Sequence, residues 1–83
     1  MCKTSIVEHN VTFCQLLKES LCSRFPGMEI EEEQDGRHLF NKIDSFHPKI
    51  VFTDIRLPGE NGLELTKKIK KNYPDIIIGL IRF

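Results

Sequence analysis

The chain has 83 residues, and its twelve basic and twelve acidic side chains cancel to give no net charge at pH 7. This length allows one domain and is near the lower limit that a single hydrophobic core stabilises unaided. The balanced charge gives no reason to expect binding to nucleic acid or to an anionic membrane, and 40% hydrophobic residues with 29% charged ones are typical of a folded soluble protein.

The apolar stretches and the cysteines limit the cellular location. The longest apolar run, residues 76–81, is too short to cross a bilayer, and the first residues are polar where a signal sequence would be apolar. Cys2, Cys14 and Cys22 form neither a CxxC pair nor a zinc-binding pattern with histidines, so we expect free thiols. These features together favour a cytoplasmic protein.

The first half of the chain predicts two strands and two helices. Residues 3–7 read as a strand that ends in a polar cluster, and residues 28–32 alternate apolar and acidic side chains as a half-buried strand would. Between them a helix is predicted to end at Pro26-Gly27. Thr12 and Gln15 have the spacing of a capping box at its start, and its apolar face is predicted to contain Phe13, Leu16, Leu17, Leu21 and Phe25.

The second half continues this alternation. After Asp35-Gly36 a helix is predicted that ends before Pro48, with an apolar face of Leu39, Phe40, Ile43 and Phe46. Residues 50–53 form an uncharged strand, as expected of a strand covered on both faces. A loop at residues 57–62 precedes a helix marked by Leu65, Ile69 and Tyr73, and residues 76–81 are predicted to be a buried strand. Strands joined by helices favour a parallel sheet with right-handed crossovers.

One carboxylate, Asp54, follows the uncharged strand directly. In an open α/β sheet, ligands and reacting groups gather outside the carboxyl ends of the strands, where the strand order reverses. Asp54 is therefore the leading candidate for a functional residue. The alternative is that its carboxylate only caps the following turn, as aspartate often does.

Several segments resemble the receiver domain of two-component response regulators. They are Ile6-Val7-Glu8 at the end of the first strand, Phe25-Pro26-Gly27, Asp35-Gly36 and, above all, FTDIRLPGENGLEL at residues 52–65. The resemblance covers nearly the whole chain and implies the flavodoxin-like fold: three α/β/α layers around a parallel sheet with strand order 2-1-3-4-5. Receiver domains with similar sequence motifs lie N-terminal to helix-turn-helix DNA-binding domains in the same protein, but this sequence contains no such domain.

The resemblance implies a phosphoacceptor. Asp54 would take a phosphoryl group from a histidine kinase or a phosphotransfer protein and form an acyl phosphate in a phosphorelay. Mg²⁺ would be held by Glu8, Asp54 and the backbone carbonyl of Arg56, because a hard cation neutralises clustered carboxylate and phosphoryl oxygens. We do not expect an enzyme that acts on a separate substrate.

Three features depart from the receiver pattern. His9 stands where the family has a second acid, which should weaken Mg²⁺ binding because imidazole is a poor ligand for this ion; His9 is alternatively an exposed residue that binds nothing. Ile81 stands where a Ser or Thr hydroxyl contacts the phosphoryl group, and it cannot form that hydrogen bond. The sequence also contains no counterpart of the final helix, strand and helix, or of the lysine on that strand, so we expect residues 1–83 to be a receiver domain lacking this portion, or a piece of a longer protein.

These departures suggest two further hypotheses. The predicted last strand would form an unpaired apolar edge, and such edges recruit other strands, so we expect the chain to self-associate through it. The alternative function is a phosphorylation-independent interaction or dimerisation module on a receiver scaffold. A flavin or nucleotide binder is poorly supported, because no glycine-rich phosphate loop follows the first strand.

Overall fold

A parallel sheet forms the centre of the molecule. The computed structural model describes residues 2–57 and 60–81. Within these residues the main sheet has four strands in the order β2-β1-β3-β6, which are β1 (Lys3–Val7), β2 (Glu29–Glu33), β3 (Ile50–Asp54) and β6 (Ile77–Ile81). The predicted strand order is confirmed for these four strands, and each lies within one residue of its predicted limits.

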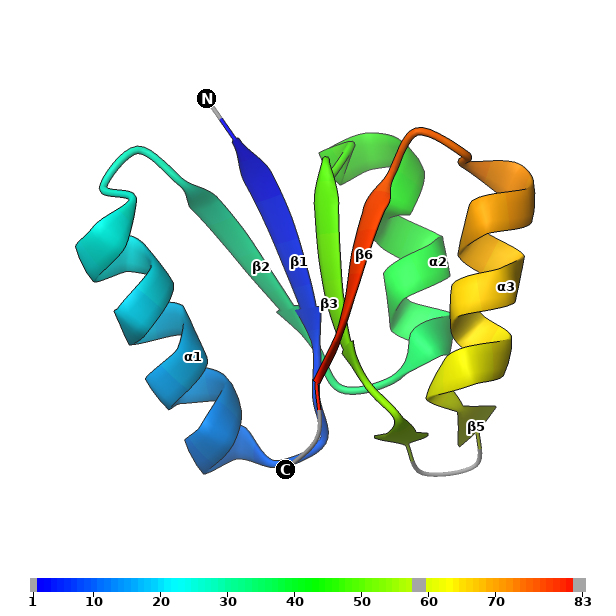
Figure 1. Ribbon diagram of the computed structural model, residues 1–83, viewed down its shortest axis with the longest axis horizontal. Coiled ribbons are helices and arrows are strands. Elements are labelled where there is room, and N and C mark those ends of the chain that lie inside the picture. Colours follow the sequence, from blue (N-terminus) through cyan, green and yellow to red (C-terminus); the bar gives the residue numbers. More distant parts are fainter. Residues whose placement is uncertain (1, 58–59, 82–83) are drawn as a thin grey trace.

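Helices cover the two faces of the sheet unequally (Figure 1). Helix α1 (Val11–Arg24) lies on one face, whereas α2 (Gly36–Phe46) and α3 (Gly62–Asn72) lie side by side on the other. None of the helices in the described part of the chain is long and apolar enough to span a membrane. The arrangement is the three-layer α/β/α fold that the sequence predicts.

The hydrophobic core lies between the sheet and the pair α2 and α3. Apolar residues spaced three or four apart on each helix meet Val7 of β1, Val51 of β3 and Ile76, which directly precedes β6. The buried members are Val7, Leu39, Ile43, Val51, Leu57, Leu65, Ile69 and Ile76. The predicted apolar faces of both helices are therefore confirmed for their central positions.

Helix α1 differs from its prediction in how it begins. The residue that caps it is Asn10, whose side-chain oxygen accepts the N–H of Phe13 at 2.9 Å. Thr12 lies inside the first turn, so the predicted capping box is wrong. The sequence pattern was ambiguous because Asn and Thr are both common N-cap residues, and the preceding strand ends early enough to leave Asn10 in the extended conformation.

The predicted apolar face of α1 is largely not buried. Cys14 is its only buried residue, while Leu16 and Phe25 remain 56% and 53% exposed. In Figure 1 this helix covers the sheet beside β2 and β1, away from β6. Within the described residues no second helix lies beside it on this face, so the apolar stripe has little to pack against.

The prediction that the last strand is buried is also wrong. Ile77 is 62% exposed and Leu80 is 45% exposed, because β6 is an edge strand and α1 does not reach it. For the same reason β3 is not covered on both faces: Ile50 and Phe52, which point to the α1 side, are only half-buried.

The predicted loop after β3 contains two short strands. β4 (Arg56–Leu57) pairs antiparallel with β5 (Glu60–Asn61), and Asn61 then caps α3 by accepting the N–H of Leu63. Pro58 and Gly59 of the predicted loop lie outside the described residues. This small hairpin joins the end of β3 to α3.

Candidate functional site

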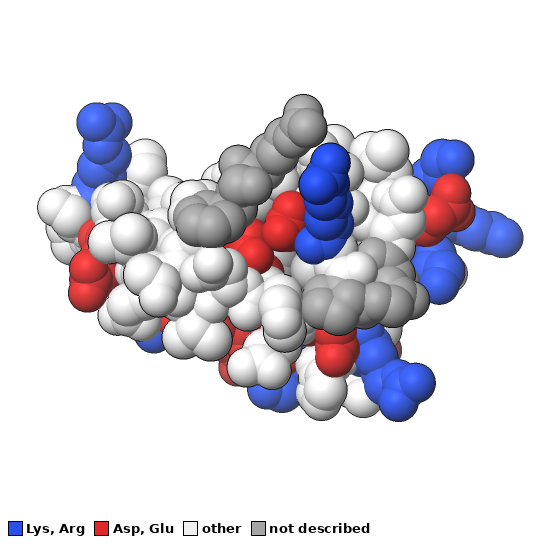
Figure 2. Space-filling model, turned by 90° about the horizontal axis from the view of Figure 1, so that it is seen from below, with Lys and Arg blue, Asp and Glu red and all other residues white. Residues whose placement is uncertain are grey.

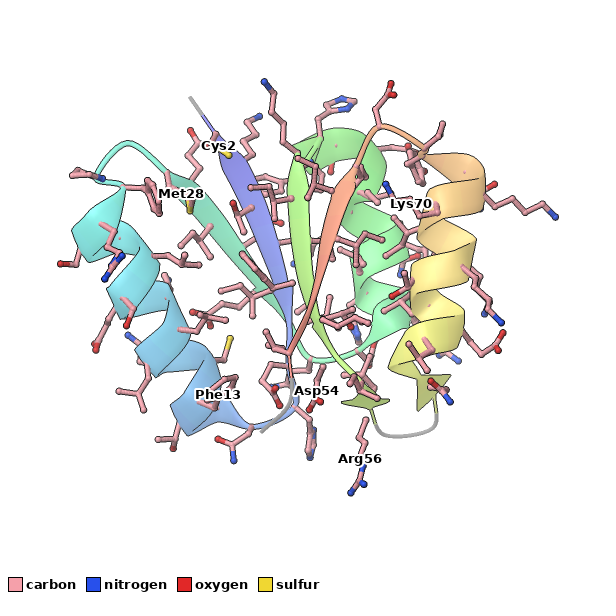
Figure 3. The ribbon with its side chains drawn as sticks, in the orientation of Figure 1. Cys2, Phe13, Met28, Asp54, Arg56 and Lys70 are labelled. Carbon is pink, nitrogen blue, oxygen red and sulfur yellow. The ribbon has the colours of Figure 1, made fainter. Side chains whose placement is uncertain are left out.

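Asp54 is the last residue of β3, at the carboxyl end of the sheet, as predicted. Its side chain is 8% exposed, and its Oδ1 accepts the backbone N–H of Arg56 at 3.1 Å. Figure 3 shows Asp54 at the lower end of the sheet and the side chain of Arg56 extending away from it. This hydrogen bond is the one expected if Asp54 caps the turn that follows β3. It uses only Oδ1, so the other carboxylate oxygen remains available for a reaction.

Glu8 lies beside this carboxylate because its strand does. β1 and β3 are neighbours, and Val7 is in register with Thr53. The next residues, Glu8 and Asp54, therefore lie close together at the carboxyl ends of the two strands. The Glu8 side chain is only 3% exposed, and its Oε1 accepts the N–H of Asn10 at 2.9 Å. Its Oε2 is buried and has no hydrogen-bond partner among the described residues.

Burial raises the pKa of the Glu8 carboxyl above its ordinary value of 4.5. The negative charge of Asp54 also raises this pKa, while the N–H of Asn10 acts in the opposite direction. Two carboxylates in contact cannot both be ionised without cost, so a proton or a cation between them is favoured.

The raised pKa of Glu8 predicts how the free energy of unfolding of the metal-free protein changes with pH. The folded protein binds the Glu8 proton more tightly than the unfolded chain, so the resulting stabilisation is present at low pH and is lost as pH rises above 4.5 toward the folded pKa. We expect Glu8→Gln to avoid this loss, so that the variant gains stability relative to wild type as pH increases. Urea unfolding in EDTA at a series of pH values measures this difference. The exposed Glu64→Gln is the control, and an equal trend in both variants would contradict the prediction.

The remaining predicted site residues lie around this pair. His9 is exposed, and Ile81 lies on β6 in register with Asp54, half-buried, with its backbone carbonyl accepting the N–H of Ile55 at 3.2 Å. Ile81 is therefore next to Asp54 on the neighbouring strand and brings no polar side-chain atom there. Figure 2, which views this end of the molecule, shows acidic side chains at its centre with one basic side chain directly beside them and others toward the rim.

Sequence reasoning missed the contribution of Gly62. Its N–H donates to the carbonyl of Ile55 at 2.8 Å, and a Cβ atom built on it would lie 2.1 Å from the carbonyl oxygen of Asp54. Only glycine allows the start of α3 to approach the end of β3 this closely. The glycine directly before a predicted helix was the available signal, but glycines before helices have many other causes.

The carboxylate pair suits a hard cation such as Mg²⁺. Magnesium sites in proteins commonly use one or two carboxylates and keep several waters. The buried, unpartnered Oε2 of Glu8 next to Asp54 is an oxygen that such an ion would satisfy. Within the described residues no group of three or more His, Cys, Asp or Glu side chains is arranged to hold a metal ion, so the site offers two carboxylates and backbone oxygen rather than a closed cage.

Comparison with known proteins identifies the fold and its family. Residues 5–81 match the response regulator receiver domain family, and the chain belongs to it. It is 31% identical over 67 residues to the transcriptional regulatory protein DegU of Brevibacillus brevis, covering 75% of this chain and 28% of that protein. It is 38% identical over 42 residues to the sensory transduction protein LytT of Oceanobacillus iheyensis, covering 51% of this chain and 17% of that protein. The chain thus spans less than a third of these curated relatives.

A solved structure supports the same conclusion at the level of the backbone. The response regulator TrrA of Thermotoga maritima, in complex with Mg²⁺ and beryllium fluoride, is 32% identical and superposes with a TM-score of 0.90, covering 99% of this chain and 70% of TrrA. TrrA has also been solved with the histidine kinase ThkA, at 32% identity and a TM-score of 0.86, covering 96% of this chain and 67% of TrrA. The flavodoxin-like receiver fold and the two-component family are therefore as predicted.

Proposed function

We propose that Asp54 is the phosphoacceptor of this receiver domain, in a phosphorelay with a histidine kinase or a phosphotransfer protein. The observation that carries the proposal is the position of the Asp54 carboxylate at the carboxyl end of β3, in contact with the buried Glu8. The complex of TrrA with ThkA supports the choice of partner, because TrrA is a relative with the same fold. The test is whether acetyl phosphate adds one phosphoryl group at Asp54.

The proposed reaction is a phosphoryl transfer between side chains. A carboxylate oxygen of Asp54 attacks phosphorus, a new O–P bond forms, and the P–N bond to the donor imidazole breaks. The electron pair of the broken bond stays on the imidazole nitrogen, which takes up a proton. The hydrogen bond from the N–H of Arg56 to Oδ1 holds the carboxylate in one orientation during the attack. The domain acts on itself, so we do not class it as an enzyme.

Mg²⁺ is the proposed cofactor, held by Glu8, Asp54 and the backbone carbonyl of Arg56. When bound, the ion would neutralise the negative charge that gathers on the carboxylate and phosphoryl oxygens. The Mg²⁺ in the TrrA structure and the unpartnered Oε2 of Glu8 support this assignment. We expect weaker affinity than in a receiver with two acids after β1, because His9 adds no negative charge and is not an oxygen ligand.

We further propose that the response to phosphorylation is weakened. A receiver switch needs a hydroxyl near the phosphoryl group, and the residue in register with Asp54 on the neighbouring strand is Ile81. The phosphorylated state would lack this hydrogen bond.

We also propose a cytoplasmic location, as expected from the sequence. The free thiols of Cys2, Cys14 and Cys22 support it, because disulfides are rare in the cytoplasm.

The edge of β6 that no other described strand pairs with favours a second candidate function, which is self-association independent of phosphorylation. The N–H of Ile77 donates to Lys49 on the β3 side, and the carbonyl of Ile81 accepts from Ile55 on that side. Backbone groups alternate along a strand, so those of Ile78 and Leu80 point to the open edge. At the opposite edge of the sheet, β2 has the sequence EIEEE, and its charged side chains discourage pairing. Self-association is therefore proposed through β6 rather than β2.

We expect Ile77→Lys to reduce self-association. Ile77 is 62% exposed next to the open edge, and a charge there opposes pairing with a second copy while leaving the core unchanged. Sedimentation velocity over a range of concentrations measures the effect as a shift toward monomer. Leu16→Lys on α1, at a side chain that is 56% exposed, is the matched control and should associate like wild type. A wild-type chain that stays monomeric at high concentration excludes this candidate function.

A further inference from the structure

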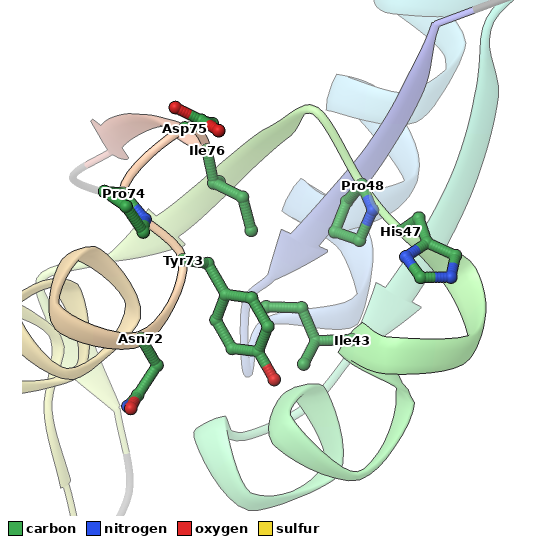
Figure 4. Close-up of a pocket in the computed structure, with 8 residues that line it drawn as sticks. All are labelled: Ile43, His47, Pro48, Asn72, Tyr73, Pro74, Asp75 and Ile76. Carbon is green, nitrogen blue, oxygen red and sulfur yellow. The ribbon is translucent and has the colours of Figure 1, made fainter.

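The two ends of the sheet carry hollows with different surroundings. Opposite Asp54, a cleft of about 300 Å³ lies between the last turns of α2 and α3 (Figure 4). Its rim is mixed in charge, because the Lys70 ammonium donates to the carbonyls on both sides of Asp75. At the other end, a hollow of about 140 Å³ is lined by Glu8, the first turn of α1 and the end of β2. The second hollow, unlike the first, contains a residue of the proposed metal site.

Glu8 is held between β2 and the start of α1. Its backbone N–H donates to the carbonyl of Glu33 on β2 at 3.0 Å, which ties the residue to the sheet beyond the end of β1. Its side-chain Oε1 accepts the N–H of Asn10 at 2.9 Å. The carboxyl group is therefore anchored through Oε1, and the buried Oε2 is the oxygen left to bind a cation together with Asp54.

Asn10 is itself fixed by the first turn of α1. Its side-chain oxygen accepts the N–H of Phe13 at 2.9 Å, and its backbone carbonyl accepts the N–H of Cys14 at 3.0 Å. Cys14 is 4% exposed and is the buried residue of the helix, so this turn is the part of α1 that packs most closely against the molecule. The N–H that reaches Glu8 thus comes from a turn held by two hydrogen bonds and one buried side chain.

The electrostatics of this contact favour an ionised Glu8. Burial has the largest effect on the pKa of Glu8 and raises it, whereas the N–H of Asn10 lowers it, and the N–H of His9 acts in the same direction as that of Asn10. The N-terminal end of a helix carries partial positive charge, and the first turn of α1 contains no acidic side chain that would compete for it. Because a cation binds the ionised carboxylate, the contact favours metal binding as well as orienting the ligand.

We propose that Asn10 is a positioning residue for the metal site: by capping α1, its side chain fixes the backbone N–H that holds the Glu8 carboxylate for Mg²⁺. The inference rests on the proposed function, in which Glu8 and Asp54 hold the ion. A residue that only capped the helix would stabilise the fold and leave the affinity for the ion unchanged. The two roles can be separated because the cap and the N–H are different atoms of Asn10.

The test measures the affinity of the unphosphorylated protein for Mg²⁺ by chemical-shift titration of the ¹⁵N-labelled chain. Asn10→Ser keeps a capping oxygen and should bind Mg²⁺ within about twofold of wild type. Asn10→Ala keeps the N–H but loses the cap, and should bind up to about fivefold more weakly, because a cap stabilises its conformation by a similar factor. Asn10→Pro also loses the N–H and should bind about tenfold more weakly, as expected when a metal ligand loses the partner that orients it. The φ of Asn10, −78°, is within the range that proline allows.

Asp35→Ala is the matched control. It removes the corresponding cap from α2, where the Asp35 Oδ1 accepts the N–H of His38 at 2.9 Å. It should lose stability like Asn10→Ala and keep the Mg²⁺ affinity of wild type. A dispersed amide spectrum confirms that each variant is folded, and if Asn10→Pro is not, the comparison of Asn10→Ala with Asn10→Ser decides. Equal affinities in those two variants, or equal weakening in Asp35→Ala, would overturn the proposal.

Failure of this inference can be distinguished from failure of the proposed function. At saturating Mg²⁺, acetyl phosphate should label Asn10→Ala as fast as wild type, because only the affinity for the ion has changed. Wild-type affinity in both Asn10→Ala and Asn10→Pro, with Asp54 labelled normally, would overturn the positioning role alone. Weaker binding in these variants, with no labelling of wild type, would support the positioning role and refute the phosphoacceptor. A wild-type chain that binds no Mg²⁺ would overturn both the positioning role and the proposed cofactor.

Discussion

The Asp54→Ala variant is expected to gain no phosphoryl group when incubated with acetyl phosphate and Mg²⁺, whereas the wild-type chain gains one. The substitution removes the only carboxylate at the end of β3 and leaves no other nucleophile in its place. Intact mass measured before and after incubation reports the addition directly. Glu8 is buried and its pKa is raised, so it is a poor replacement for the missing nucleophile.

Two controls make this result interpretable. Asp35→Ala removes an exposed carboxylate that caps α2, so it should still be labelled at Asp54 if it is folded. His9→Asp restores a second acid beside Glu8, and we expect it to be labelled faster than wild type at limiting Mg²⁺ because the ion gains an oxygen ligand. No labelling of folded wild-type protein, or equal labelling of wild type and Asp54→Ala, would refute the phosphoacceptor role.

The Gly62→Ala variant is expected to lose at least about 3 kcal/mol of unfolding free energy, the upper end for overpacking of a folded interior. The new methyl carbon would lie 2.1 Å from the carbonyl oxygen of Asp54 and 2.8 Å from the Cα of Ile55. Both contacts are with backbone, so β3 and α3 must separate to relieve them. Small domains have about 5 kcal/mol or slightly more in total, so much of this protein's stability would be lost. Urea unfolding followed by circular dichroism measures the effect.

Gly79→Ala is the matched comparison. Its methyl carbon would lie 2.7 Å from the ring of Phe52, which is a side chain that is only half-buried on the open α1 side of the sheet. The ring can move outward, and replacing a glycine within a strand recovers about 0.5–1 kcal/mol of conformational entropy. We therefore expect a net change within about 1 kcal/mol. If the two variants were equally destabilised, the close approach at Gly62 would not explain its effect.

The two comparisons address different parts of the site. The Asp54 variants test the chemistry of the carboxylate at the end of β3. The glycine variants test how that carboxylate is positioned, because Gly62 fixes the distance between the start of α3 and the carbonyl of Asp54. A Gly62→Ala protein that remains partly folded should also be labelled more slowly, since its Asp54 backbone is displaced.

The sequence alone predicted the four strands of the main sheet, the three helices and the positions of Asp54 and Glu8, but not the short strands β4 and β5. These features depend on local signals, namely the period of apolar residues and the Pro and Gly residues that end each element. The strand order was predicted from the resemblance of residues 52–65 to the receiver family. In that order β1 and β3 are parallel neighbours, so their carboxyl ends lie side by side. No knowledge of distant contacts was needed for these conclusions.

Only the tertiary structure decided which of the apolar side chains are buried. Leu16 and Ile77 fit apolar patterns as well as Leu39 and Val51 do, but they remain exposed because no described element lies opposite them. A periodic pattern records which residues could be buried, whereas burial depends on the neighbour across the gap.

The finer features of the site likewise depend on neighbours that are distant in sequence. The close approach of Gly62 to Asp54 and the raised pKa of Glu8 both arise between segments brought together by the fold. Steric contact and the cost of burying a charge are set by three-dimensional surroundings, which a local pattern does not contain. The sequence therefore determined the fold and the candidate residues, and the tertiary structure determined their environment, because contacts between remote segments exist only after folding.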